Sequence, residues 1–171
     1  NINIEIIKSG KKALDMFLNI FPIIILWSGI MAIALKSGLL HKMSTFLFPI
    51  LSKIFPEIPK NHESLGFISS NLIMNMFGLG SAATPMGLKA MRSLQTLNGK
   101  KDAATRSMIT FLVINTSGVT LIPTTVISLR MLHNSVNPTS IISTTMIATL
   151  LSLIIAVIID KIFFKFYKEK I

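Results

Sequence analysis

Cysteine is absent from this 171-residue chain, and charged residues are scarce. Without thiols the chain has no disulfide, no cysteine nucleophile and no cysteine-ligated zinc or iron–sulfur site. Charged residues make up 14% of the chain and hydrophobic ones 51%, whereas about a quarter of the residues in soluble domains are charged. The composition excludes an ordinary soluble globular protein and indicates an integral membrane protein.

Acidic residues and histidines are missing from the centres of the long apolar stretches between residues 16 and 159. A serine or threonine nucleophile there would lack a general base. The three histidines, His41, His62 and His133, stand far from one another and from carboxylates at metal-ligand spacing. No phosphate-binding loop occurs either. We therefore predict that the chain is not an enzyme and holds no metal or cofactor.

The formal net charge is +10, because 17 lysines and arginines outnumber 7 carboxylates. Such an excess can indicate nucleic-acid binding, but that function needs a basic face with aromatic or helical readers. Here the basic residues lie between apolar stretches, where they contact phospholipid head groups and set the topology. We predict membrane lipids, and not nucleic acid, as partners.

Four apolar segments are long enough to approach or cross a bilayer, which takes roughly 20 helical residues. They cover residues 16–35, 64–88, 107–129 and 141–159. An amphipathic stretch over residues 39–55, interrupted at Pro49, is expected on the membrane surface or against the bundle. The prediction is an all-α polytopic membrane helical bundle, multi-pass in the cell membrane.

The whole chain is expected to form a single membrane domain, residues 1–171, with its core over about residues 30–130. The last transmembrane helix covers residues 141–159, and a basic, aromatic tail over residues 160–171 anchors at the head groups. Because the chain begins at Asn1 and not at a methionine, we expect an N-terminal segment to be missing.

The apolar segment at residues 71–87, NLIMNMFGLGSAATPMG, contains helix-breaking residues, which are Gly78, Gly80 and Pro85. A glycine in a helix interior costs about 1 kcal/mol and a proline about 3 kcal/mol. We therefore expect two half-helices, over residues 64–77 and 85–97. Thr84 would cap the second half-helix, with Pro85 at its first position, and that helix start would offer N–H groups to an anion.

Asn71 and Asn75 are four residues apart, so their amides lie on one face of the first half-helix and point toward the break. Transporters often build a site near the bilayer midplane from broken helices and side-chain amides. The alternative is that small and amide residues pack helices closely and hydrogen-bond across an interface. Spacing alone leaves both interpretations open, as it leaves open whether the central segment crosses the membrane or re-enters.

The third apolar segment repeats the pattern, since Asn115, Gly118 and Pro123 echo Asn75, Gly78 and Pro85. Its hydroxyl residues Ser117, Thr120, Thr124 and Ser128 fall on one face if the segment is helical. We predict a second broken or re-entrant helix near Gly118–Pro123. The alternative is an ordinary kinked helix whose hydroxyls bond the carbonyls one turn earlier.

The last apolar segment carries a stripe of small residues, Thr144, Ala148, Ser152 and Ala156. Small residues every four positions let helices approach closely. We predict a helix-packing seam there.

Several stretches together make the sequence resemble the spore maturation protein A family, which carries the nucleoside-recognition or gate domain. They are SGLL at 37–40, KIFPEIP at 53–59, the central segment 71–89 with GLGSAATPMGLKA, SMITFL at 107–112, NTS at 115–117 and LIPTT at 121–125. The resemblance implies a multi-span protein of the cytoplasmic membrane of endospore-forming bacteria, acting in spore core dehydration together with a spore maturation protein B-like partner. Similar gate domains occur in concentrative nucleoside and ferrous iron transporters.

The leading functional prediction is a transport or channel component for a small solute or ion. The residues expected to line its pathway are Asn71, Asn75, Gly78, Gly80, Thr84, Asn115, Ser117, Thr120 and Thr124. The alternative is a non-transporting membrane scaffold that supports modification of cortex peptidoglycan, with the polar breaks serving as packing seams.

Overall fold

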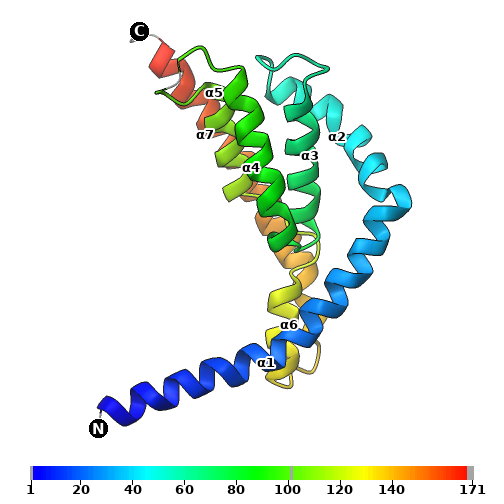
Figure 1. Cartoon of the computed structure of the whole chain (residues 1–171), viewed down its shortest axis with the longest axis vertical. Helices are drawn as coiled ribbons and strands as arrows, with labels where there is room; N and C mark the ends of the chain where they lie inside the picture. The colour runs from blue at the N-terminus through cyan, green and yellow to red at the C-terminus, as the bar shows by residue number, and fades with distance from the viewer. Residues whose placement is uncertain (1, 101, 169–171) are drawn as a thin grey trace.

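The computed structural model describes residues 2–100 and 102–168, and every regular element in them is helical. Figure 1 shows the chain as a bundle of short helices with two long helices, α1 and α7. The elements are α1 (Ile2–Ala34), η1 (Leu35–Leu39), α2 (Leu40–Ile54), α3 (Glu63–Met76), α4 (Gly80–Thr96), α5 (Arg106–Thr116), α6 (Thr124–Leu132), η2 (Pro138–Ser140) and α7 (Ile141–Lys168). The all-α prediction is confirmed for the described residues.

Helices α1 and α2 meet at a kink where Gly38 takes a φ of +93°, a backbone conformation that glycine adopts at little cost. The predicted interruption at Pro49 is wrong, because α2 continues through it from Leu40 to Ile54. A proline removes one backbone hydrogen bond, but Leu51 and Phe55 just beyond it are buried against the core. That packing holds the second half of α2 in line.

Helices α3 and α4 lie side by side and run in opposite directions, so the chain reverses at residues 77–79 (Figure 1). His62 begins α3, since its Nδ1 accepts from the Ser64 N–H at 3.3 Å. The start predicted for the second half-helix at Pro85 is wrong, because α4 begins at Gly80. We call α3, residues 77–79 and α4 the hairpin.

Helices α5 and α6 form the second interrupted segment, but here the chain continues in one direction (Figure 1). Residues 117–123 between them are not helical. The prediction that Ser117, Thr120, Thr124 and Ser128 share one helical face is therefore wrong. From the end of α6 the chain turns through η2, and α7 returns along the whole bundle to the end where the hairpin begins and ends.

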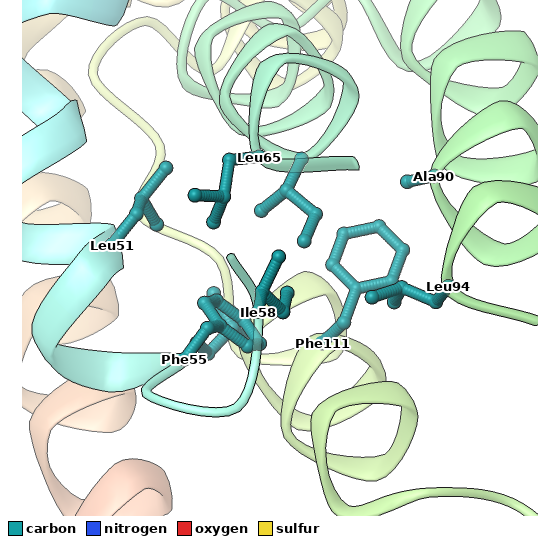
Figure 2. Packing of buried hydrophobic residues seen from close by; sticks show 9 residues of the cluster. Leu51, Phe55, Ile58, Leu65, Ala90, Leu94 and Phe111 are labelled. Carbon is teal, nitrogen blue, oxygen red and sulfur yellow. The ribbon is translucent and has the colours of Figure 1, made fainter. Parts of the chain in front are cut away.

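The main core joins α2, the hairpin and α5 at that end of the molecule. It consists of Leu51, Phe55, Ile58, Leu65, Ile68, Ala90, Leu94, Phe111 and Ile114. Figure 2 shows Phe111 reaching from α5 toward Ala90 and Leu94 on α4. A second cluster of Met74, Leu79 and Ala83 packs with Trp27 at the opposite end of the hairpin, its tip. The two clusters hold the hairpin at both ends.

Helices α1 and α7 are long and apolar enough to cross a bilayer, over Glu5–Ile30 and Pro138–Phe166. Their most apolar windows bury no residue inside the chain, so their isoleucine, leucine and phenylalanine side chains need another apolar cover. Helix α7 continues to Lys168, so residues 160–168 of the predicted tail are helical. Residues 169–171 lie outside the described part.

Three of the four residues of the predicted packing seam on α7 face away from the described part of the chain. Thr144, Ala148 and Ser152 are exposed and Ala156 is half-buried, whereas the neighbouring positions Thr145, Thr149, Leu153 and Val157 are all half-buried. The side of α7 that faces the bundle is therefore shifted by one residue from the small-residue stripe.

Candidate functional site

The two interrupted segments cross each other at the tip of the hairpin. The Leu121 N–H donates to the Met76 carbonyl at 2.8 Å, and the Thr124 hydroxyl lies 3.5 Å from the Gly78 carbonyl. A Cβ on Gly78 would lie 2.7 Å from the Thr124 Oγ1 and 2.8 Å from the Ile122 carbonyl oxygen. Only glycine fits where the two segments touch.

Gly78 also determines how α3 ends. The Leu79 N–H bonds the Met74 carbonyl at 2.9 Å, and the Gly78 N–H bonds the Asn75 carbonyl at 3.0 Å. Together with a φ of +72° at Gly78, these bonds form a Schellman motif, in which a left-handed glycine closes a helix. Met74 and Leu79 pack together, which is the apolar contact that usually accompanies this motif.

Two side chains from distant helices bond the backbone freed at the breaks. The Trp27 indole N–H donates to the Phe77 carbonyl at 3.0 Å, and the Thr120 N–H donates to the Thr149 hydroxyl oxygen at 3.1 Å. Irregular backbone at membrane depth persists only where such groups find partners. Sequence reasoning missed both residues, although a tryptophan in the middle of an apolar segment, away from an interface, was a usable signal.

Three asparagine amides connect the hairpin to α5. The Asn71 amide nitrogen donates to the Ala83 carbonyl at 2.8 Å, across the hairpin. The Asn75 amide nitrogen donates to the Asn115 Oδ1 at 2.9 Å and lies 3.5 Å from the Asn71 Oδ1. Asn71 is buried and Asn75 half-buried, whereas Asn115 is exposed. The amides thus form a chain that runs from a buried carbonyl to an accessible side chain.

These amides line a cavity of about 220 Å³, which we call the amide cavity. Its lining residues are Asn71, Asn75, Ala83, Thr84, Gly87, Leu88, Met91, Phe111, Leu112 and Asn115. A second cavity of about 400 Å³, the hydroxyl cavity, lies at the crossing. Its lining residues are Asn75, Gly78, Gly80, Thr120, Pro123, Thr124, Thr125, Val126 and Thr145. Neither lining contains a charged side chain.

The predicted role of Thr84 as a helix cap is wrong. Its hydroxyl donates to the Gly80 carbonyl at 2.9 Å, one turn earlier within α4. The N-terminus of α4 lies at Gly80, four residues before Thr84. Thr84 is therefore not at a helix start, so the anion site predicted there has no free helix N-terminus, and this residue forms part of the cavity wall.

Ser117 lies in neither lining, and its hydroxyl donates to the Val113 carbonyl at 2.6 Å. The other eight predicted pathway residues fall into the two cavities. Asn71, Thr84 and Asn115 line the amide cavity, Gly78, Gly80, Thr120 and Thr124 the hydroxyl cavity, and Asn75 both. Within residues 2–100 and 102–168 no group of three or more His, Asp or Glu side chains could hold a metal.

Comparison with known proteins identifies the family. The family model described as Gate, nucleoside recognition, matches residues 17–167. The chain is 47% identical over 170 residues to "Spore maturation protein A" of Bacillus subtilis (strain 168), an alignment that covers 99% of this chain and 87% of that protein. The chain belongs to the spore maturation protein A family. No solved structure matches it.

The family resemblance inferred from short motifs is thereby confirmed. Two of those motifs meet in the fold of this family member. The glycine-rich central motif forms the hairpin tip, and LIPTT at residues 121–125 forms the part of the second break that contacts it. Two of the six stretches that carry the resemblance to the spore maturation protein A family therefore build the crossing.

Proposed function

We propose that this chain is a transport or channel component for a small solute in the cell membrane of a spore-forming bacterium, acting in spore maturation and core dehydration. The sporulation context follows from its similarity to the Bacillus subtilis protein. A related membrane protein of the spore maturation protein B type would be its partner. Neither the family description nor the relative's name designates an enzyme.

The observation that supports transport is the crossing of two interrupted helices between two cavities that carry amide and hydroxyl groups. Broken helices whose freed backbone lines a cavity are a common way to build a transport pathway near the bilayer midplane. Here Met76, Phe77 and Gly78 present carbonyls at the break, each within reach of a donor from another segment. A packing seam would not require cavities of about 220 and 400 Å³ beside it.

In the proposed topology the hairpin re-enters the membrane without crossing it. Its helices have 14 and 17 residues, so each is shorter than the roughly 20 residues that a span requires. Both ends of the hairpin and the carboxyl end of α7 lie at the same end of the molecule (Figure 1). Lysines and arginines are concentrated there, including Lys60, Lys100 and Lys161, and the positive-inside rule makes this end cytoplasmic.

The proposal is tested with single cysteines in the naturally cysteine-free chain, labelled in membranes with a charged thiol reagent. Because the thiolate is the reactive form, labelling requires water at the site. Thr84→Cys and Thr125→Cys report on the amide and hydroxyl cavities, where both side chains are exposed. Ser69→Cys is the buried control, with an exposed fraction of 1% in the native residue, and Ser152→Cys is the control on the exposed face of α7.

Transport predicts labelling at Thr84→Cys and Thr125→Cys and none at the two controls. An absence of labelling at both cavity positions in folded protein would contradict a hydrated pathway. Labelling of Ser152→Cys would show that α7 does not lie in lipid, which would contradict the proposed topology.

A scaffold remains the second candidate because the stripe of Thr144, Ala148 and Ser152 is exposed on α7 and has no packing partner in the described chain. Such a stripe suits close contact with another helix. In this case Ala148→Leu would release a membrane partner, measured by co-purification, while Asn75→Leu would leave spore maturation intact. Transport predicts that Asn75→Leu abolishes maturation although the protein still accumulates in the membrane.

A further inference from the structure

The two cavities occupy successive positions along the three segments that line both of them. On α4 the hydroxyl cavity contacts Gly80 near the tip, whereas the amide cavity begins at Ala83 and extends to Met91. On the α5 side the amide cavity ends at Asn115, and the hydroxyl cavity begins at Thr120. The cavities are therefore stacked along the direction from the hairpin ends to α6.

Asn75 stands between the cavities on α3, where it lines both. It also lines a third cavity of about 430 Å³ between α2 and α7, whose other lining residues are all apolar or glycine. Its amide nitrogen bonds the Asn115 Oδ1 at 2.9 Å, and this bond joins α3 to α5 where the amide cavity ends. The pair thus lies where the linings of the two cavities meet.

On the basis of the proposed function, we propose that the Asn75–Asn115 amide pair forms the barrier between two half-pathways and opens for uncharged, hydrogen-bonding solutes. The pair is held by one side-chain hydrogen bond, so a solute that offers its own donor and acceptor replaces that bond as the two amides separate. Asn71 supports Asn75 from one turn away, because its own amide is fixed on the Ala83 carbonyl.

The solute class follows from the lining. An ion that leaves water needs an opposite charge or several fixed ligands to offset its lost hydration. The two cavities offer amides, hydroxyls and backbone groups among apolar side chains, and Lys89 and Arg92 lie outside both linings. A small polyhydroxylated molecule can replace water's hydrogen bonds at such a surface, whereas an ion finds no counter-charge.

The barrier is tested by the sidedness of labelling in sealed vesicles of both orientations, using a charged, membrane-impermeant maleimide. Thr84→Cys is expected to react only from the side of the hairpin ends, and Thr125→Cys only from the opposite side. Each cysteine is then combined with Asn75→Ala and Asn115→Ala in one protein, which removes the barrier. In this protein each cysteine should react from both sides, and its rate of reaction from the formerly closed side should be at least tenfold higher than with the amide pair intact.

Asn98→Ala is the matched control, because it also removes an amide, which in the native chain bonds the Ala103 carbonyl outside both cavities. Sidedness should survive this change. The emission of Trp27, the one tryptophan of the chain, reports on the hairpin tip through its bond to the Phe77 carbonyl. Protein that carries both alanine substitutions and shows the native Trp27 emission is folded, and the labelling is compared only in such protein.

The barrier proposal would be overturned if each cysteine still reacted from one side only in folded protein that carries both alanine substitutions. It would also be overturned if both cysteines reacted from either side while the Asn75–Asn115 pair was intact. These results differ from failure of the proposed function, which is an absence of labelling at both positions from both sides. The solute class is read in proteoliposomes with erythritol and potassium chloride as probes. Erythritol entry should rise at least tenfold in the double-alanine variant, and an equal rise in potassium entry would overturn the assignment to uncharged solutes.

Discussion

The two helix breaks share the pattern Asn-x-x-Gly followed by Pro, yet they give different structures. At the first break the chain reverses within residues 77–79, and at the second it continues in the same direction through residues 117–123. Gly78 adopts a positive φ and forms a Schellman motif, whereas Gly118 has no positive φ. A glycine after a helix therefore permits reversal, but its conformation depends on the contacts around it.

The breaks also differ in how their backbone groups are bonded. The first is bonded mostly by other segments, through the Trp27 indole, the Leu121 N–H and the Thr124 hydroxyl. The second is longer and supplies two of those donors. A tight reversal leaves carbonyls that local bonds cannot reach, so its stability depends on distant partners. The following changes test this asymmetry, in order of decreasing expected effect.

Gly78→Ala should have the largest effect. A non-glycine residue in the left-handed region costs about 1–2 kcal/mol, and overpacking adds about 1–3 kcal/mol, because the new Cβ meets the Thr124 hydroxyl and the Ile122 carbonyl. We expect a loss of about 3 kcal/mol in the free energy of unfolding, measured by thermal or denaturant unfolding in detergent. Gly118→Ala is the matched control and should cost less than about 1 kcal/mol. Equal effects would show that the two breaks are equivalent.

Asn71→Ala should have the next largest effect. It removes the hydrogen bond that joins α3 to the Ala83 carbonyl of α4 and leaves a void at a buried position; the lost bond costs about 0.5–1.5 kcal/mol, and the unfilled volume adds to this cost. The same unfolding measurement should show a loss of about 2 kcal/mol. The neighbouring Ser70→Ala is the control, since its hydroxyl bonds only the Gly66 carbonyl of its own helix. A loss in Ser70→Ala as large as that in Asn71→Ala would assign the effect to α3 itself.

Trp27→Phe keeps an aromatic ring but removes the N–H that bonds the Phe77 carbonyl, at a cost of about 1 kcal/mol. The expected result is a looser hairpin tip, measured as faster labelling of a cysteine at Leu79, a residue only 5% exposed. Phe21→Leu on the same helix is the control, because Phe21 stacks only on Phe17. If the cysteine at position 79 is labelled at the native rate in both variants, the bond from Trp27 of α1 does not stabilise the hairpin tip.

Thr149→Val should have the smallest effect, because it removes one acceptor, that of the Thr120 N–H in the longer break. Interhelical hydrogen bonds of this kind contribute about 0.6 kcal/mol on average in membrane proteins. Thr144→Val is the exposed control, since its hydroxyl bonds only the Ile141 carbonyl in its own helix. A loss for Thr149→Val as large as that for Gly78→Ala would mean that the second break depends on distant partners as strongly as the first.

Local chemistry allowed the sequence to predict where the helices stop. Gly78 and residues 117–123 interrupt the apolar segments because glycine and proline disfavour a continuing helix, and the four-residue spacing of Asn71 and Asn75 places both amides on one face. The start at Pro85 was wrong because the Schellman turn at Gly78 brings the chain back at once, so that α4 begins at Gly80.

The prediction of which face of α7 packs against the bundle was also wrong. Small residues favour close approach in general, but which stripe is used depends on what lies opposite. Here the Thr120 N–H requires an acceptor, and Thr149 supplies it. Leu153 and Val157 also pack against the main core, so Thr145, Thr149 and Leu153 face the bundle and Ser152 lies outside.

The sequence by itself determined the membrane composition, the helical class, the family and the positions of both breaks, because these depend on residue chemistry over a few turns. Only the tertiary structure decided that the first break reverses while the second continues, and that their polar groups form two stacked cavities. The deciding hydrogen bonds join residues 40 to 50 positions apart, such as Asn75 with Asn115 and Trp27 with Phe77. Local propensity can end a helix, but it cannot select the partner that bonds the backbone it frees.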